Sequence, residues 1–136
     1  MFFVRKLLED MRDDVVLNFL TMKSNLTEVQ LDTILASVRE GNLNVKRAFR
    51  EKGPVSKGSF ARTLKQAYEN IESSVYTLFL LAYLDQAPND KLAQLGRTAR
   101  ALSELRNANP SRSDSERVIV AMQEFVRDFR GKKVIS

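Results

Sequence analysis

The residues of this chain best suited to chemistry are cations gathered in one stretch. Between positions 44 and 67, seven basic side chains stand against one acid, a local charge of +6 in a chain whose net charge is +5. Residues 1–43 carry −2 and residues 68–136 carry +1. Positive charge confined to one segment is typical of a surface that binds phosphate groups. The alternative interpretation is an ordinary solvated face that is rich in Lys and Arg.

The sequence offers little other chemistry. It contains no His and no Cys, so the usual general base and the commonest zinc ligands are missing, and disulfides are excluded. The acidic pairs Glu9-Asp10 and Asp13-Asp14 could bind a divalent cation, but adjacent acids on a helix normally face solvent. We therefore expect a protein that is not an enzyme, without catalytic residues, metal or cofactor. The lack of disulfides fits a cytoplasmic location.

The cations need a helix to position them, and residues 55–71 predict one. Ser56 is a favourable N-cap, and Val55 and Phe60 have the spacing of a hydrophobic staple, so the helix should begin at Lys57. The residues that recur every three or four positions and form its apolar face are Phe60, Leu64, Ala67 and Ile71. At about 100° per residue, the opposite side is basic and polar, as a helix in a DNA major groove requires.

A second, shorter helix is expected just before it, over residues 44–52, capped by Asn44 and closed at Gly53. The two would form a helix-turn-helix, with the second helix reading the major groove. The residues expected to contact phosphates are Lys46, Arg47, Arg50 and Lys57. The residues expected to contact base edges are Ser59, Arg62, Lys65 and Gln66.

Residues 43–71 resemble the fourth-region helix-turn-helix of bacterial sigma factors and related regulators. The matching positions run Val55-Ser56-x-Gly58-Ser59-Phe60, followed by Leu64, Ala67 and Ile71 at the family's spacing. The resemblance implies that Lys57, Ser59, Arg62, Lys65 and Gln66 touch DNA. Two features depart from the family: Pro54 lengthens the turn by one residue, and the helix continues past the point where a sigma factor's would stop. The resemblance therefore extends to the module and not to a sigma factor.

Four further helices are expected, over residues 2–22, 28–40, 90–106 and 114–130. Thr27 and Gln30 form a capping box for the second of these, and Ser113 and Glu116 form one for the last. Leu31, Ile34, Leu35 and Val38 should be buried on the 28–40 helix. A short linker joins the last two helices, which predicts an antiparallel hairpin over residues 90–130.

The recognition helix shows no break before Leu84. Its stretch 75–84 is apolar nearly all round but is too short to cross a bilayer, which takes about 20 residues. Such a stretch must be covered, either as the central helix of the chain or at a subunit interface. The expected fold is thus all-α: one domain spanning residues 1–136, a bundle of about six helices with a helix-turn-helix core at about 27–71.

Double-stranded DNA is the expected partner, and the expected function is that of a transcription regulator or architectural DNA-binding protein. A homodimer is expected through residues 75–84 and the C-terminal hairpin, and no membrane partner is expected. The alternative is an all-α adaptor whose basic face binds an acidic protein. Binding to RNA or single strands is disfavoured, because the aromatic residues of the basic region, Phe49 and Phe60, are placed on its apolar side.

Overall fold

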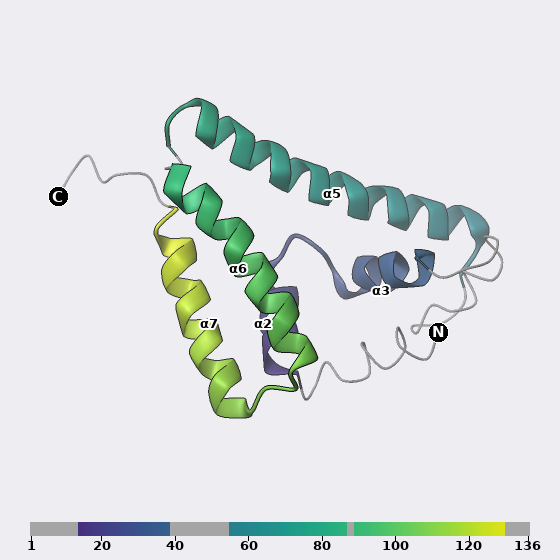
Figure 1. Ribbon diagram of the computed structural model, residues 1–136. Coiled ribbons are helices and arrows are strands. Elements are labelled where there is room, and N and C mark those ends of the chain that lie inside the picture. Colours follow the sequence, from purple (N-terminus) through teal and green to yellow (C-terminus); the bar gives the residue numbers. More distant parts are fainter. Residues whose placement is uncertain (1–13, 39–54, 87–88, 130–136) are drawn as a thin grey trace. The chain divides into compact units, whose positions relative to one another are not determined.

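The computed structural model describes residues 14–38, 55–86 and 89–129 (Figure 1). Every regular element in these ranges is an α-helix, which confirms the all-α class. Five helices are described where the sequence predicted about six, and the expected helix over residues 44–52 lies outside the described ranges. The helices are α2 (Val15–Lys23), α3 (Glu28–Ser37), α5 (Lys57–Tyr83), α6 (Asn89–Asn107) and α7 (Arg112–Arg127).

The chain divides into two compact units, Met1–Ser74 and Val75–Ser136, and the division falls within α5. The expected organisation as a single domain stays a prediction. Each unit is described here by itself.

In the first unit, α2 begins later than the sequence predicts. The backbone of Asp14 is extended, and its carboxylate accepts a hydrogen bond of 2.9 Å from the amide of Leu17. Asp14 is therefore an N-cap, and an N-cap interrupts a helix because it satisfies amide groups that a preceding turn would otherwise satisfy. The expectation of one helix running from residue 2 to residue 22 is wrong at this point.

Helix α3 begins with the predicted capping box, in which Thr27 and Gln30 exchange side-chain to backbone hydrogen bonds of 3.1 Å. Its buried side differs from the prediction. The fully buried residues are Asp32, Thr33 and Ala36, whereas Val38 is mostly exposed and Leu31, Ile34 and Leu35 are half-buried. Thr33 can be buried because its hydroxyl donates to the carbonyl of Val29 at 2.8 Å.

Polar contacts connect the turn between α2 and α3 to the middle of α5. The side-chain amide of Asn70 donates to the carbonyl of Asn25 at 3.0 Å and to Oε1 of Gln30 at 3.2 Å. The side-chain amide of Asn25 in turn donates to Oγ of Ser74 at 3.1 Å. Gln30 thus acts both in the capping box of α3 and in the attachment of α5.

In the second unit, α6 and α7 form the predicted antiparallel hairpin (Figure 1). Lys91 near the start of α6 pairs with Asp128 at the end of α7, with 3.1 Å between Nζ and Oδ2. The Lys91 ammonium also lies 6.0 Å from the ring centroid of Phe125. The Lys91 side chain is consequently only 25% exposed.

One apolar stripe of α7 packs inward, since Met122 and Phe125 are buried and Val118 and Phe129 are half-buried. The start of the helix is not as predicted. Ser111, and not Ser113, is the N-cap, and its hydroxyl accepts a hydrogen bond of 3.1 Å from the amide of Asp114.

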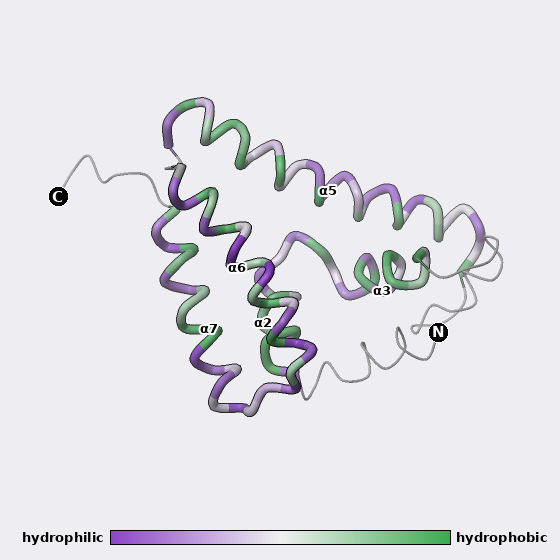
Figure 2. The backbone as a smooth tube through the Cα atoms, viewed as in Figure 1, coloured by the Kyte–Doolittle hydropathy of each residue, from purple (hydrophilic) through white to green (hydrophobic). Residues whose placement is uncertain are grey.

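The stretch 75–84 at the C-terminal end of α5 is hydrophobic over most of its length (Figure 2). The described residues bury only part of it. Leu78, Leu81 and Ala82 are half-buried, but the other large apolar side chains of this stretch are exposed. The covering of its exposed side by a second subunit stays a prediction.

Candidate nucleic-acid interface

Helix α5 begins where the sequence predicts, because Ser56 caps it. The hydroxyl of Ser56 accepts a hydrogen bond of 3.1 Å from the amide of Ser59, and its carbonyl accepts one of 2.9 Å from the amide of Phe60. From there α5 continues without interruption to Tyr83, one residue short of the predicted end.

One side of the N-terminal half of α5 packs into the first unit. Phe60 and Ala67 are buried, and Leu64 is half-buried, as their spacing predicts. Ile71, the last member of the predicted apolar face, is 39% exposed. The burial of Phe60 fixes the rotation of the helix about its axis, so it decides which residues remain outside.

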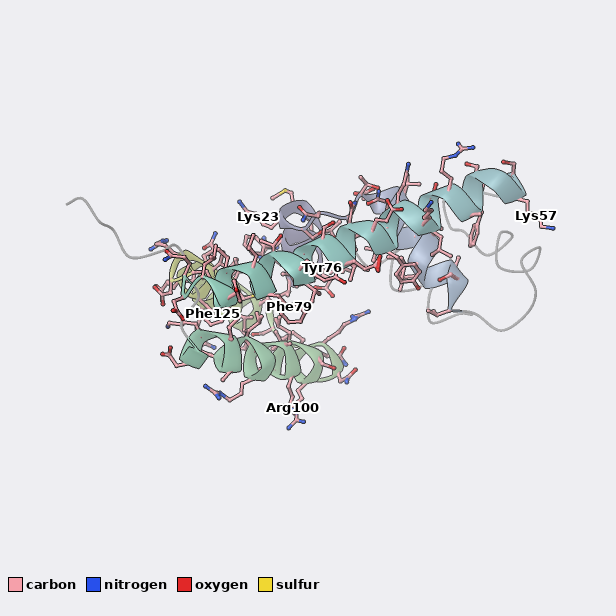
Figure 3. All side chains as sticks on the ribbon, turned by 90° about the horizontal axis from the view of Figure 1, so that it is seen from above. Lys23, Lys57, Tyr76, Phe79, Arg100 and Phe125 are labelled. Atoms are coloured by element: carbon pink, nitrogen blue, oxygen red, sulfur yellow. The ribbon has the colours of Figure 1, made fainter. Side chains whose placement is uncertain are left out.

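The side of α5 away from Phe60 presents most of the predicted DNA-binding residues. Arg62, Lys65 and Gln66 are exposed there, and Ser59 is half-buried. Lys57 is exposed at the N-terminal end of the helix, nearer its apolar side. Figure 3 shows Lys57 at the N-terminal end of the helix. No described residue covers Arg62 or Lys65, as a surface that contacts a large ligand requires. That these residues contact DNA stays a prediction.

The contacts that Lys65 and Arg62 make within the described residues leave both cations able to bind a phosphate group. Lys65 Nζ lies 3.9 Å from Oε1 of Glu69, and the two side chains are 79% and 58% exposed. An exposed pair at this separation contributes little and can be exchanged for a phosphate contact. Among the described residues, Arg62 makes no ion pair.

The cationic side of α5 ends at Lys65, because Glu69 and Glu72 follow it one and two turns further on. A nucleic acid on this side would therefore lie over the first three turns of the helix and not over its middle. Tyr68 is also exposed beside these turns, and the sequence analysis did not single it out. It was not recognised as a candidate contact because it stands between Leu64 and Ile71, two residues of the apolar pattern.

Glycine at position 58 leaves open space on the helix surface. A Cβ atom built there would meet nothing within 4 Å. The described residues thus give no packing reason for this glycine, whose position in the first turn would allow a ligand backbone to approach closely.

The remaining predicted contacts, Lys46, Arg47 and Arg50, lie outside the described residues. So do the expected helix over residues 44–52 and the turn that contains Pro54. The helix-turn-helix as a pair of helices therefore stays a prediction, and only its second helix is described.

Among the described residues, no cluster of acidic side chains is suited to hold a metal ion. None of the described helices combines the length and apolar character needed to span a membrane. Comparison with family models, with curated proteins and with solved structures finds no match to this chain.

Proposed function

We propose that the protein binds double-stranded DNA through the exposed side of the N-terminal half of α5, as a transcription regulator or architectural DNA-binding protein. The observation that carries the proposal is the exposure of Arg62 and Lys65 on a capped helix whose opposite side is buried, with Lys57 exposed at its N-terminal end. Such a helix is held in one orientation, so its cations can face a groove together. Arg62 and Lys65 would contact base edges, and Lys57 would contact phosphate.

The helix N-terminus supports the same assignment. Its first amides point outward along the axis and carry partial positive charge, which favours a phosphate at this end. Lys57 stands at that end of α5. The cations Lys46, Arg47 and Arg50 would add phosphate contacts from the preceding segment.

The test is replacement of Arg62 and Lys65 together by Ala, with DNA binding measured by fluorescence anisotropy at several salt concentrations. We expect loss of sequence-specific binding, at about 1 to 3 kcal/mol for each base contact. Circular dichroism should show an unchanged fold, because both side chains are exposed.

The matched control is replacement of Arg97 and Arg100 in α6 by Ala. These two arginines are exposed and stand three residues apart, as Arg62 and Lys65 do. Replacing them removes the same charge. The control variant should retain specific binding. An equal loss in both variants would show that only bulk charge matters and would contradict the assignment of α5.

A second candidate function is that of an all-α adaptor whose basic face binds an acidic protein. The exposure of Lys57, Arg62 and Lys65 supports it, because the same cations could pair with the carboxylates of such a partner. Competition by bulk duplex DNA separates the two functions, because an adaptor would keep its partner in its presence.

We also propose that the protein acts as a homodimer, using the region of residues 75–84 and the C-terminal hairpin. Two copies would present two basic helices to one DNA molecule, which is the usual arrangement of helix-turn-helix proteins.

A further inference from the structure

Four of the exposed apolar residues of the second unit form one stripe on α5. Tyr76, Phe79, Leu80 and Tyr83 are 70%, 64%, 56% and 84% exposed, and their spacing is i, i+3, i+4 and i+7. This spacing places them on a single side of the helix. Leu78, Leu81 and Ala82 lie on the opposite side and are half-buried within the unit.

The stripe is a defined surface. The rings of Tyr76 and Phe79 contact each other edge to face, with their centroids 6.4 Å apart, and Figure 3 labels both residues on α5. Aromatic residues concentrated in this way are typical of the centre of a protein interface. We call these four residues the aromatic stripe.

We propose that the aromatic stripe binds the aromatic stripe of a second copy, with the two α5 helices antiparallel. The inference rests on the proposed homodimer and specifies its surface and its geometry. The exposed parts of the four side chains amount to roughly 500 Å² in each copy, so a pair would bury roughly 1,000 Å², the lower limit for a specific interface. Val75 and Leu84, which are also exposed, would enlarge that area.

The charges along α5 select the antiparallel orientation. Continued toward the N-terminus at the same helical spacing, the side of the stripe carries Glu72, Glu69 and Lys65. In a parallel pair each of these charges would face its own copy, and like charges side by side are destabilising. In an antiparallel pair the charged halves extend in opposite directions beyond the contact. Arg62 and Lys65 of both copies then remain exposed to DNA.

The first test is the oligomeric state without nucleic acid, measured by sedimentation equilibrium. We expect the unmodified chain to form a dimer and Phe79→Glu to be a monomer, because a buried carboxylate without a partner is costly. Met22→Glu is the matched control, since Met22 is similarly exposed, at 72%, but lies on α2 in the first unit. It should remain dimeric.

A monomeric unmodified chain, or a Phe79→Glu variant that remains dimeric, would overturn the inference. So would a monomer that co-sediments with phosphatidylserine vesicles through Phe79, because the stripe would then be a membrane contact. A monomer that binds DNA would contradict the dimer but not the DNA-binding proposal. A dimer that fails to bind DNA would contradict the DNA-binding proposal but not the dimer.

The second test measures the orientation. The chain contains no Cys, so Ala61→Cys places one spin label on the exposed side of α5. A rise of about 1.5 Å per residue places the two labels of an antiparallel dimer about 55 Å apart, whereas those of a parallel dimer would be about 10 Å apart. Pulsed electron resonance separates these distances, and the short one would overturn the antiparallel arrangement.

Discussion

Gly58 is the residue at which stability and binding can be separated most directly. In the free protein, alanine at this position would meet no neighbour within 4 Å. Alanine is the better helix former, so Gly58→Ala should raise the free energy of unfolding by about 0.5 to 1 kcal/mol. We expect the same substitution to weaken DNA binding, because the added methyl group would occupy the space into which the DNA backbone fits. Urea denaturation and anisotropy measure the two effects.

Gly96 in α6 provides the control for this experiment. A Cβ atom there also meets nothing within 4 Å. Gly96→Ala should therefore stabilise the protein by a similar amount and leave DNA affinity unchanged. If Gly58→Ala binds DNA as tightly as the unmodified protein, DNA does not approach the first turn of α5.

Asp85 has a strained backbone conformation. Its φ is 57°, in the left-handed region, where it ends α5. The backbone amide of Gln86 donates to the carbonyl of Leu81 at 2.8 Å, and the backbone amide of Asp85 donates to the carbonyl of Ala82 at 3.1 Å. This is the Schellman pattern, whose left-handed position is usually glycine.

Asp85→Gly should therefore raise the free energy of unfolding by about 0.5 to 1 kcal/mol, since it relieves the strain and removes an acid from the negative end of the helix. Urea denaturation measures the change. Asp85→Ala removes the same charge but keeps a Cβ atom in the left-handed conformation. Stabilisation by Ala as large as that by Gly would show that charge, and not backbone strain, is the cause.

At the scale of the element, the start of α7 makes stability depend on pH. Hydrogen bonds from Ser111 and then the neighbouring Arg117 hold the pKa of Asp114 below its ordinary value. The pKa of Asp114 is lower in the folded state than in the unfolded state, so its carboxylate stabilises the fold at pH values above the pKa of the unfolded state. That contribution is lost as the pH falls through the folded pKa.

Asp114→Asn should therefore lower the midpoint of thermal unfolding at pH 7. The difference from the unmodified protein should shrink in acid, as Asp114 becomes protonated. Asp128→Asn, which removes the carboxylate that pairs with Lys91, controls for the general loss of an acid from the hairpin. A difference for Asp114→Asn that stays constant from neutral to acid pH would show that the charge of Asp114 does not matter.

The elements differ in how far the sequence predicts them, and the reason is the range of the interactions involved. The start of α5 and the capping box of α3 were predicted correctly because Ser56, Thr27 and Gln30 act on amides within three residues. The start of α7 was missed because Ser111 and Ser113 each stand three residues before an acid. Local rules do not rank two such candidates.

Interactions between distant residues were not predictable in this way. The burial of Asp32 and Thr33 runs against their polarity, and it depends on what packs against α3. The pairing of Lys91 could not be predicted, because nothing near it in sequence reveals Asp128, 37 residues away. The exposed side of α5 was predictable, because the burial of Phe60 and Ala67 sets which side of the helix faces solvent. Its DNA contacts stay a prediction.

At the scale of the whole molecule, the two proposed surfaces belong to different units that share one helix. Arg62 and Lys65 lie in the unit of residues 1–74, and the aromatic stripe lies in the unit of residues 75–136. Substitutions at one surface should therefore leave the fold of the other unit intact. Variants of each surface can then be combined to separate DNA binding from assembly.

The same helix also determines the optical properties of the chain. The protein has three tyrosines and no tryptophan, and Tyr68, Tyr76 and Tyr83 all lie on the exposed surface of α5. Its intrinsic ultraviolet emission thus originates from this one element. Any event that buries or exposes that surface should therefore change the tyrosine fluorescence of the unlabelled protein, without a dye to perturb it.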